Sequence, residues 1–133
     1  MRGAGLAIFA AAILGANLAA PAAARRHRLH VPPTSLPRSL AVDEKEWQVQ
    51  PSETQIAAGT IQFHAYNRGQ DSHNFVIENA AGQIYGYVPL RPGASATVVA
   101  NLPPGTYKLF CSLYAGTPES HDLLGMHAYI TVR

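Results

Sequence analysis

The chain has 133 residues, with ten basic and eight acidic side chains and a formal net charge of +2 at pH 7. This length allows one domain around a single core and excludes a second domain. The nearly balanced charge gives no support for nucleic-acid binding, which requires a basic patch with interleaved aromatic residues.

The N-terminal 24 residues have the features of a secretory signal peptide. They begin with a positive start, continue with an apolar run from Gly3 to Leu18, and end in small residues. The run is short for a membrane span, because a spanning helix needs about 20 apolar residues. We therefore expect a signal peptide over 1–24, no stable membrane span after cleavage, and a protein in the periplasm or otherwise secreted. An uncleaved anchor is the alternative.

Residues 25–40 differ in composition from the rest of the chain. They contain four arginines and three prolines. This composition favours an extended, flexible arm without a core of its own. The remaining residues, 41–133, are the expected folded domain.

From Trp47 onward, short alternating segments are separated by turn residues, and no long stretch has a helical period. Strands are expected near residues 46–50, 60–66, 73–78, 83–88, 95–100, 105–111 and 126–132. Glycine and proline turn signals lie between them. This spacing predicts an all-β domain, a Greek-key β-sandwich of seven to eight strands.

Four residues have the chemistry of a metal site: His73, Cys111, His121 and Met126. Two imidazoles, one thiolate and one thioether are the ligand set of a blue-copper centre. An unpaired cysteine is unusual in an exported protein, and metal ligation explains it because a coordinated thiolate is protected from oxidation. Zinc is the rival metal, but a methionine sulfur is a poor zinc ligand.

Taken singly, each of these residues has an ordinary interpretation as a surface histidine, a core methionine or a small buried cysteine. Strand alternation argues for the set, because His73, Cys111 and Met126 share a face with the apolar residues of their strands. The other two histidines of the domain, His64 and His127, alternate outward.

The sequence resembles small blue-copper proteins of the cupredoxin family, such as plastocyanin and azurin, from about Trp47 to Arg133. Five stretches carry this resemblance: A-G-T-I-Q-F (58–63), S-H-N-F-V-I (72–77), L-R-P-G-A-S (90–95), P-P-G-T-Y-K-L-F-C-S (103–112) and G-M-H-A-Y-I-T-V (125–132).

The resemblance implies one type 1 copper per chain. His73 and His121 would be its imidazole ligands, Cys111 its thiolate ligand and Met126 its axial thioether. It also implies that Asn74 and Ser112 tie the strand of the first histidine to the cysteine loop, which would fix the orientation of the ligands.

One feature departs from the family pattern. Nine residues separate Cys111 from His121, whereas small members usually have only a few between these two ligands. Gly116, Thr117 and Pro118 make the extra segment prone to turns, so it can bulge outward while the two ligands still converge. Colour and reduction potential depend on the resulting fine geometry.

Four protein donors leave no open position for substrate, so the site favours electron transfer over catalysis. The chain also lacks the G-x-S-x-G motif of hydrolases. We therefore expect a monomeric periplasmic carrier, not an enzyme, that passes single electrons between redox partners such as c-type cytochromes or an oxidase or reductase. By resemblance, His121 would lie at the molecular surface, and the docking face around it would be formed by Leu113, Leu123, Leu124 and Gly125.

A second hypothesis is a copper-binding module for copper storage, sensing or delivery, because the fold alone does not decide function. Cleavage after Ala24 would expose Arg25, Arg26 and His27, and a histidine third from a free amine can chelate Cu(II). A basic cluster at the processing site is the simpler interpretation of these residues. A structural domain without metal is the third hypothesis.

Overall fold

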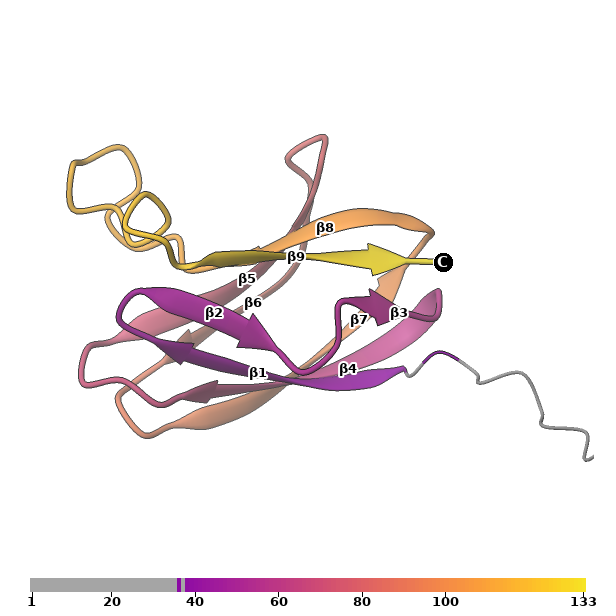
Figure 1. Ribbon diagram of the computed structural model, residues 1–133, viewed down its shortest axis with the longest axis horizontal. Coiled ribbons are helices and arrows are strands. Elements are labelled where there is room, and N and C mark those ends of the chain that lie inside the picture. The colour runs from indigo at the N-terminus through magenta and orange to yellow at the C-terminus, as the bar shows by residue number, and fades with distance from the viewer. Residues whose placement is uncertain (1–35, 37) are drawn as a thin grey trace, which may run out of the picture. The chain divides into compact units, whose positions relative to one another are not determined.

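The computed structural model describes residue 36 and residues 38–133 (Figure 1). This part of the chain forms nine strands and no helix, so it contains no helix able to cross a membrane. The strands are β1 (Ser39–Lys45), β2 (Gln48–Pro51), β3 (Gln55–Ile56), β4 (Gly59–Asn67), β5 (His73–Asn79), β6 (Ile84–Leu90), β7 (Ser95–Leu102), β8 (Gly105–Phe110) and β9 (His127–Val132).

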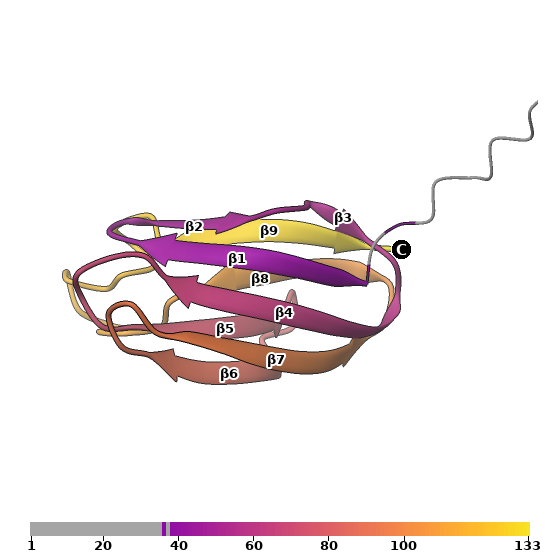
Figure 2. The same ribbon diagram turned by 90° about the horizontal axis from the view of Figure 1, so that it is seen from below.

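The strands form two sheets that pack face to face. One sheet has the order β2-β1-β4-β7 and the other has the order β3-β9-β8-β5-β6. Both sheets are mixed, since β1 pairs with β4 and β3 pairs with β9 in parallel, while the other pairs are antiparallel. Figure 2 shows the strands of the two sheets running in nearly the same direction. The predicted all-β sandwich is confirmed, with nine strands instead of seven or eight.

Side chains point alternately to the two faces of each strand, and those on the inner faces form the core between the sheets. In β4, Ile61, Phe63 and Ala65 are fully buried, while the residues between them are more exposed. The ring of Phe63 lies 5.7 Å from that of Phe75 in the opposite sheet. Burial of each phenylalanine contributes about 1.5–3 kcal/mol to stability, so this pair helps to hold the two sheets together.

The sequence did not reveal β1 and β3, and it placed β2 slightly too early. β1 begins at Ser39, so Ser39 and Leu40 belong to the sandwich and not to the arm expected over 25–40. Its inward positions are Leu40, Val42 and Glu44, and the carboxyl at the third position conceals the apolar alternation. The expected signal peptide over 1–24 and most of the arm lie outside the described residues.

Glu44 is a buried carboxylic acid on the inner face of β1. Its side chain is fully buried, and neither carboxyl oxygen has a hydrogen-bond partner within the described residues. Burial raises the pKa of Glu44 to about 8 from its ordinary value of 4.5, because the charged form is poorly solvated there. The folded protein therefore holds this carboxyl in its neutral form at neutral pH.

Glu44→Gln tests this assignment, because glutamine imitates the neutral acid at every pH. Between pH 4.5 and pH 8 the folded chain keeps a proton that the unfolded chain has lost, so Glu44 lowers the free energy of unfolding as the pH rises. We expect the stability of the variant relative to the parent to increase across this range, by on the order of a few kcal/mol. Urea denaturation of the metal-free proteins measures it.

The exposed Glu53 provides the matched control. The stability of Glu53→Gln relative to the parent should stay nearly constant over the same pH range. A constant difference for Glu44→Gln as well would show that Glu44 ionises normally in the folded protein.

Candidate metal centre

Three of the four expected ligands meet at one end of the sandwich. His73 begins β5, Cys111 directly follows β8, and His121 lies in the segment before β9. All three side chains are buried, and one donor atom from each lies within 4.8 Å of the others. The two Nδ1 atoms are 3.2 Å apart, and Cys111 Sγ lies 3.3 Å from Nδ1 of His121 and 4.0 Å from Nδ1 of His73.

These separations fit a single ion held by three donors. Nitrogen ligands at about 2.0 Å and a thiolate at about 2.3 Å, spread evenly in one plane, lie roughly 3.5–3.7 Å from one another. The observed distances of 3.2, 3.3 and 4.0 Å bracket that value. The set of two imidazoles and one thiolate suits copper.

Met126 is attached to the same cluster through its backbone. Its N–H donates to the carbonyl of His121 at 2.9 Å, and its own carbonyl accepts the N–H of Cys111 at 3.1 Å. Its side chain is fully buried and belongs to the core. Two of the three converging residues therefore determine where the Met126 backbone lies.

The predicted link between Asn74 and Ser112 is present. The Ser112 N–H donates to Asn74 Oδ1 at 2.7 Å, and Asn74 Nδ2 donates to Ser112 Oγ at 3.0 Å. The backbone N–H of Asn74 also points at Cys111 Sγ, 3.4 Å away. The start of β5 is thus fastened to the residue that follows the cysteine, which fixes His73 and Cys111 relative to each other.

Burial shifts the pKa values of Cys111 and His121. It raises the pKa of the Cys111 thiol, although the N–H groups of Asn74 and Leu113 partly oppose this effect. Burial, assisted by His73, lowers the pKa of His121 and favours the neutral imidazole, whose lone pair can bind a metal. Metal binding would release the thiol proton, so affinity should increase with pH.

Glu46 is a functional residue that the sequence analysis missed. His73 Nε2 lies 3.0 Å from Glu46 Oε1, and the same oxygen accepts the N–H groups of Asp71 at 2.8 Å and Gln70 at 3.0 Å. The N–H of Asp71 is the main cause that lowers the pKa of Glu46, and His73 and Gln70 contribute.

The ionised Glu46 carboxylate fixes the tautomer of His73. A carboxylate only accepts hydrogen bonds, so Nε2 of His73 must carry the proton and Nδ1 is left free toward Cys111 and His121. Gly69 leaves the room for this contact, because a Cβ at that position would collide with the Glu46 carboxylate. No motif marks this pair, which is 27 residues apart in the sequence.

The structure corrects the expected exposure of His121. Its side chain is only 4% exposed, because two aromatic side chains flank it. The Trp47 ring centroid lies 4.8 Å from that of His121, and the Tyr114 centroid lies 5.3 Å away on a second side. Sequence reasoning placed Trp47 in a strand and gave Tyr114 no role.

The expected ring of leucines is also only partly present. Leu123 is 75% and Leu124 is 44% exposed, but Leu113 is half-buried and packs against the core. Gly125 lies against the backbone of Trp47, with a φ of +119° and its Cβ position only 2.9 Å from the Trp47 carbonyl oxygen. A glycine is therefore required where the two turns touch.

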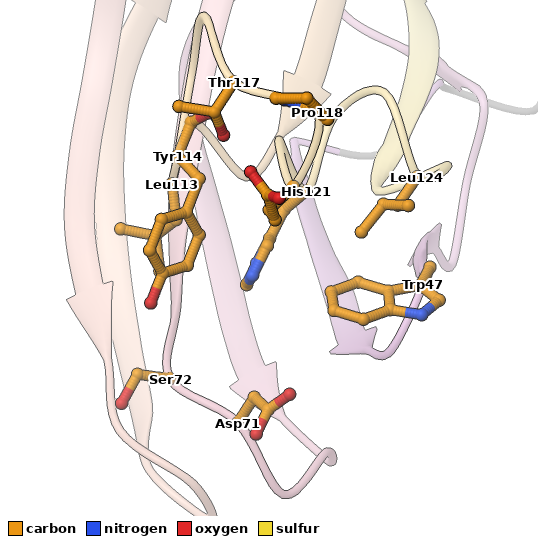
Figure 3. A pocket seen from close by; sticks show the side chains of 10 residues that line it. Trp47, Asp71, Ser72, Leu113, Tyr114, Thr117, Pro118, His121 and Leu124 are labelled. Atoms are coloured by element: carbon orange, nitrogen blue, oxygen red, sulfur yellow. The ribbon is translucent and has the colours of Figure 1, made fainter.

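A hollow of about 770 Å³ opens beside His121. Figure 3 shows the imidazole pointing into it, with Leu113 and Tyr114 on one side, Trp47 and Leu124 on the other, and Asp71 and Ser72 at the far end. The long segment between Cys111 and His121 thus bulges outward, as its turn residues predict, and forms one wall of this hollow.

The comparisons with known proteins agree with this architecture. The family model of the cupredoxin-like domain matches residues 6–120, so the chain belongs to the cupredoxin family. The match includes His73 and Cys111 and ends one residue before His121. No curated protein matches the chain.

Of three similar solved structures, the two with TM-scores of 0.50 or higher support the same fold. Dithionite-reduced auracyanin from the photosynthetic bacterium Roseiflexus castenholzii has a TM-score of 0.60 and 22% identity over 74% of this chain and 99% of that chain. A purple cupredoxin from Nitrosopumilus maritimus has a TM-score of 0.46 and 19% identity over 72% of this chain and 99% of that chain. A multicopper oxidase has a TM-score of 0.50 and 17% identity over 71% of this chain and 41% of that chain.

Removal of the Glu46 carboxylate should weaken copper binding. Glu46→Ala leaves His73 free to rotate and to place its proton on either nitrogen, and such losses typically reduce metal affinity about tenfold to hundredfold. Glu46→Gln keeps an acceptor oxygen and should lose less. Competition with a Cu(I) chelator measures the affinities, with Glu53→Ala as the control. Equal affinities for parent, Glu46→Gln and Glu46→Ala would show that the contact does not support the site.

Proposed function

We propose that this protein is an exported type 1 copper protein that carries single electrons between redox partners. The observation that carries the proposal is the convergence of His73, Cys111 and His121 in a buried cluster with separations that fit one ion. Membership of the cupredoxin family agrees with a copper-binding electron carrier. The secretory features of residues 1–24 support export to the periplasm.

Each residue of the cluster has a distinct role in this proposal. His73, Cys111 and His121 would hold the copper, and Met126 would supply a weak fourth donor. Bound copper supplies a one-electron couple between Cu(I) and Cu(II). The bonds from Glu46 to His73 and from Asn74 to Ser112 keep the donors in place, so that little rearrangement accompanies a change of charge.

The proposed site is closed to chemistry beyond electron transfer. Its donors are buried, and the four-donor set leaves no coordination position for a substrate. A role as a carrier and not as an enzyme is therefore favoured. The exposed Leu123 and Leu124 beside His121 would provide a small apolar contact for a c-type cytochrome or for an oxidase or reductase. A monomer would leave this contact free.

One observation favours the alternative of copper storage, sensing or delivery. Trp47 and Tyr114 cover His121, so a partner protein cannot reach the imidazole edge directly. Such a cover would slow electron exchange while protecting a bound ion. Voltammetry separates the two functions, since a fast reversible couple supports a carrier and a sluggish or absent couple with tight binding supports copper handling.

Replacement of the cysteine tests the copper assignment. The oxidised protein should bind one copper and show the intense visible absorption of a Cu(II)–thiolate bond. Cys111→Ser should abolish this band, because a hydroxyl is a much poorer copper donor. His127→Ala, which removes an outward-facing imidazole, should retain the full band. Visible spectra and metal analysis measure both, and a band that survives in Cys111→Ser would refute the assignment.

Substitution of Met126 tests its role as the axial ligand. Met126→Leu should keep the copper and raise the reduction potential, because loss of a weak donor disfavours Cu(II) more than Cu(I). Met126→Gln should lower the potential. Voltammetry of the two variants against the parent decides the matter. Potentials that do not change would remove Met126 from the ligand set while leaving the other three donors in place.

A further inference from the structure

The hollow beside His121 combines aromatic and acidic side chains in its lining. It is formed by residues far apart in the sequence, from Trp47 to Leu124, and its volume of about 770 Å³ lies in the range of small-molecule sites, about 300–1,000 Å³. Among the described residues, the lining contains no lysine or arginine. Its chemistry is therefore that of an aromatic slot with acidic groups, not of a generic apolar cleft.

Two aromatic faces border the hollow, and each is held in place. Trp47 is 41% exposed, and its backbone packs against Gly125. Tyr114 is 62% exposed and occupies the left-handed backbone region with a φ of 57°. A tyrosine in that region costs of order 1–3 kcal/mol, and the N–H and hydroxyl of Thr117 hold it there by donating to the Tyr114 carbonyl at 3.1 and 2.9 Å.

Two carboxylates give the hollow its charge. Asp71 and Glu119 line it with exposed side chains, and neither takes part in an ion pair within residues 38–133. A cation placed between these carboxylates and the aromatic faces would be attracted by the negative charge of the carboxylates and by the faces of the rings.

We propose that this hollow binds a small aromatic cation, with its ring beside Trp47 and Tyr114 and its charged nitrogen toward Asp71 at the far end of the hollow. Aromatic surface and negative charge are the two features of the lining, and an aromatic amine in its protonated form complements both. A protein surface fits the interior of the hollow less well than a small ring does, because the segment 112–120 forms one of its walls, and it would instead contact the exposed Leu123 and Leu124.

A ring bound in the hollow lies against His121, the metal-site residue that borders it. An aromatic one-electron donor or acceptor would thus be held in contact with a copper ligand. This consequence rests on the proposed electron-transfer function, whereas the binding itself does not. The two can therefore be tested separately.

Trp47 is the only tryptophan of the chain and lines the hollow, so its fluorescence reports occupancy directly. The probes are benzylamine, benzyl alcohol and benzoate, which share one ring and differ in charge. With the reduced, copper-loaded full chain, and again with the metal-free chain, benzylamine should change the tryptophan emission saturably and bind most tightly. Benzyl alcohol should bind more weakly and benzoate least.

Two variants and one control assign the contacts. Asp71→Asn keeps the backbone bonds that Asp71 makes to Glu46 and Asn67 and should weaken benzylamine about twofold to fivefold while leaving benzyl alcohol unchanged. Tyr114→Leu removes one aromatic face and should weaken benzylamine by a similar factor. Tyr87→Leu alters an exposed tyrosine outside the hollow and should change neither affinity.

Three results would overturn the inference. The first is a change in tryptophan emission that does not saturate with benzylamine, and the second is equal affinity for the three probes. The third is equal affinity for benzylamine and Nα-acetyl-lysine amide. That result would indicate that the hollow binds a basic side chain of a protein. Failure of the proposed function is distinguishable, because a chain that shows no Cu(II)–thiolate band can still bind benzylamine saturably. A protein that shows the Cu(II)–thiolate band but does not bind benzylamine saturably would refute the proposed ligand site and leave the proposed copper function intact.

Discussion

The attachment of the chain segment after β8 determines whether this protein has a metal centre. Cys111 directly follows β8 and continues its inward-facing series, and the next residue, Ser112, is fastened to β5 through Asn74, which helps to bring the sulfur to the two imidazoles. On its other side, the Cys111 N–H bonds to the Met126 carbonyl, and the Met126 N–H bonds to His121. Cys111 therefore lies between two hydrogen-bonded segments, and the donor geometry is set by backbone and amide contacts before any ion binds.

Two glutamates close together in the chain show how location decides charge. Glu46 accepts N–H groups from Asp71 and Gln70 and contacts His73, so its carboxylate is ionised and useful as a hydrogen-bond acceptor. Glu44 points into the core, has no hydrogen-bond partner in the described part of the chain, and is neutral. The first supports the site, whereas the second lowers stability as the pH rises. The Coulomb effect of Glu44 also reaches Cys111, so a neutral Glu44 avoids a buried negative charge beside the thiolate.

The sequence predicted the sandwich and the convergence of His73, Cys111 and His121 because both depend on strand alternation and ligand chemistry. It did not predict β1, since Glu44 occupies an inward position, or the role of Glu46, since a turn brings it to His73 from 27 residues away. The cover over His121 was also missed. It depends on contacts between Trp47, Gly125 and the long ligand segment, and none of these has a periodic signal.

The segment between Cys111 and His121 both covers the metal site and forms part of the hollow beside it. By placing Tyr114 beside His121, it completes a dry environment in which soft and imidazole donors can bind copper without competition from water. By bulging outward, it also forms the wall of a hollow that ends at that imidazole. Two approaches to the centre are thus separate: a partner protein would meet the exposed Leu123 and Leu124, whereas a small ring would enter the hollow beside Trp47 and Tyr114. The nine residues between Cys111 and His121 therefore shape the approach to the ligands, and the ligands still converge.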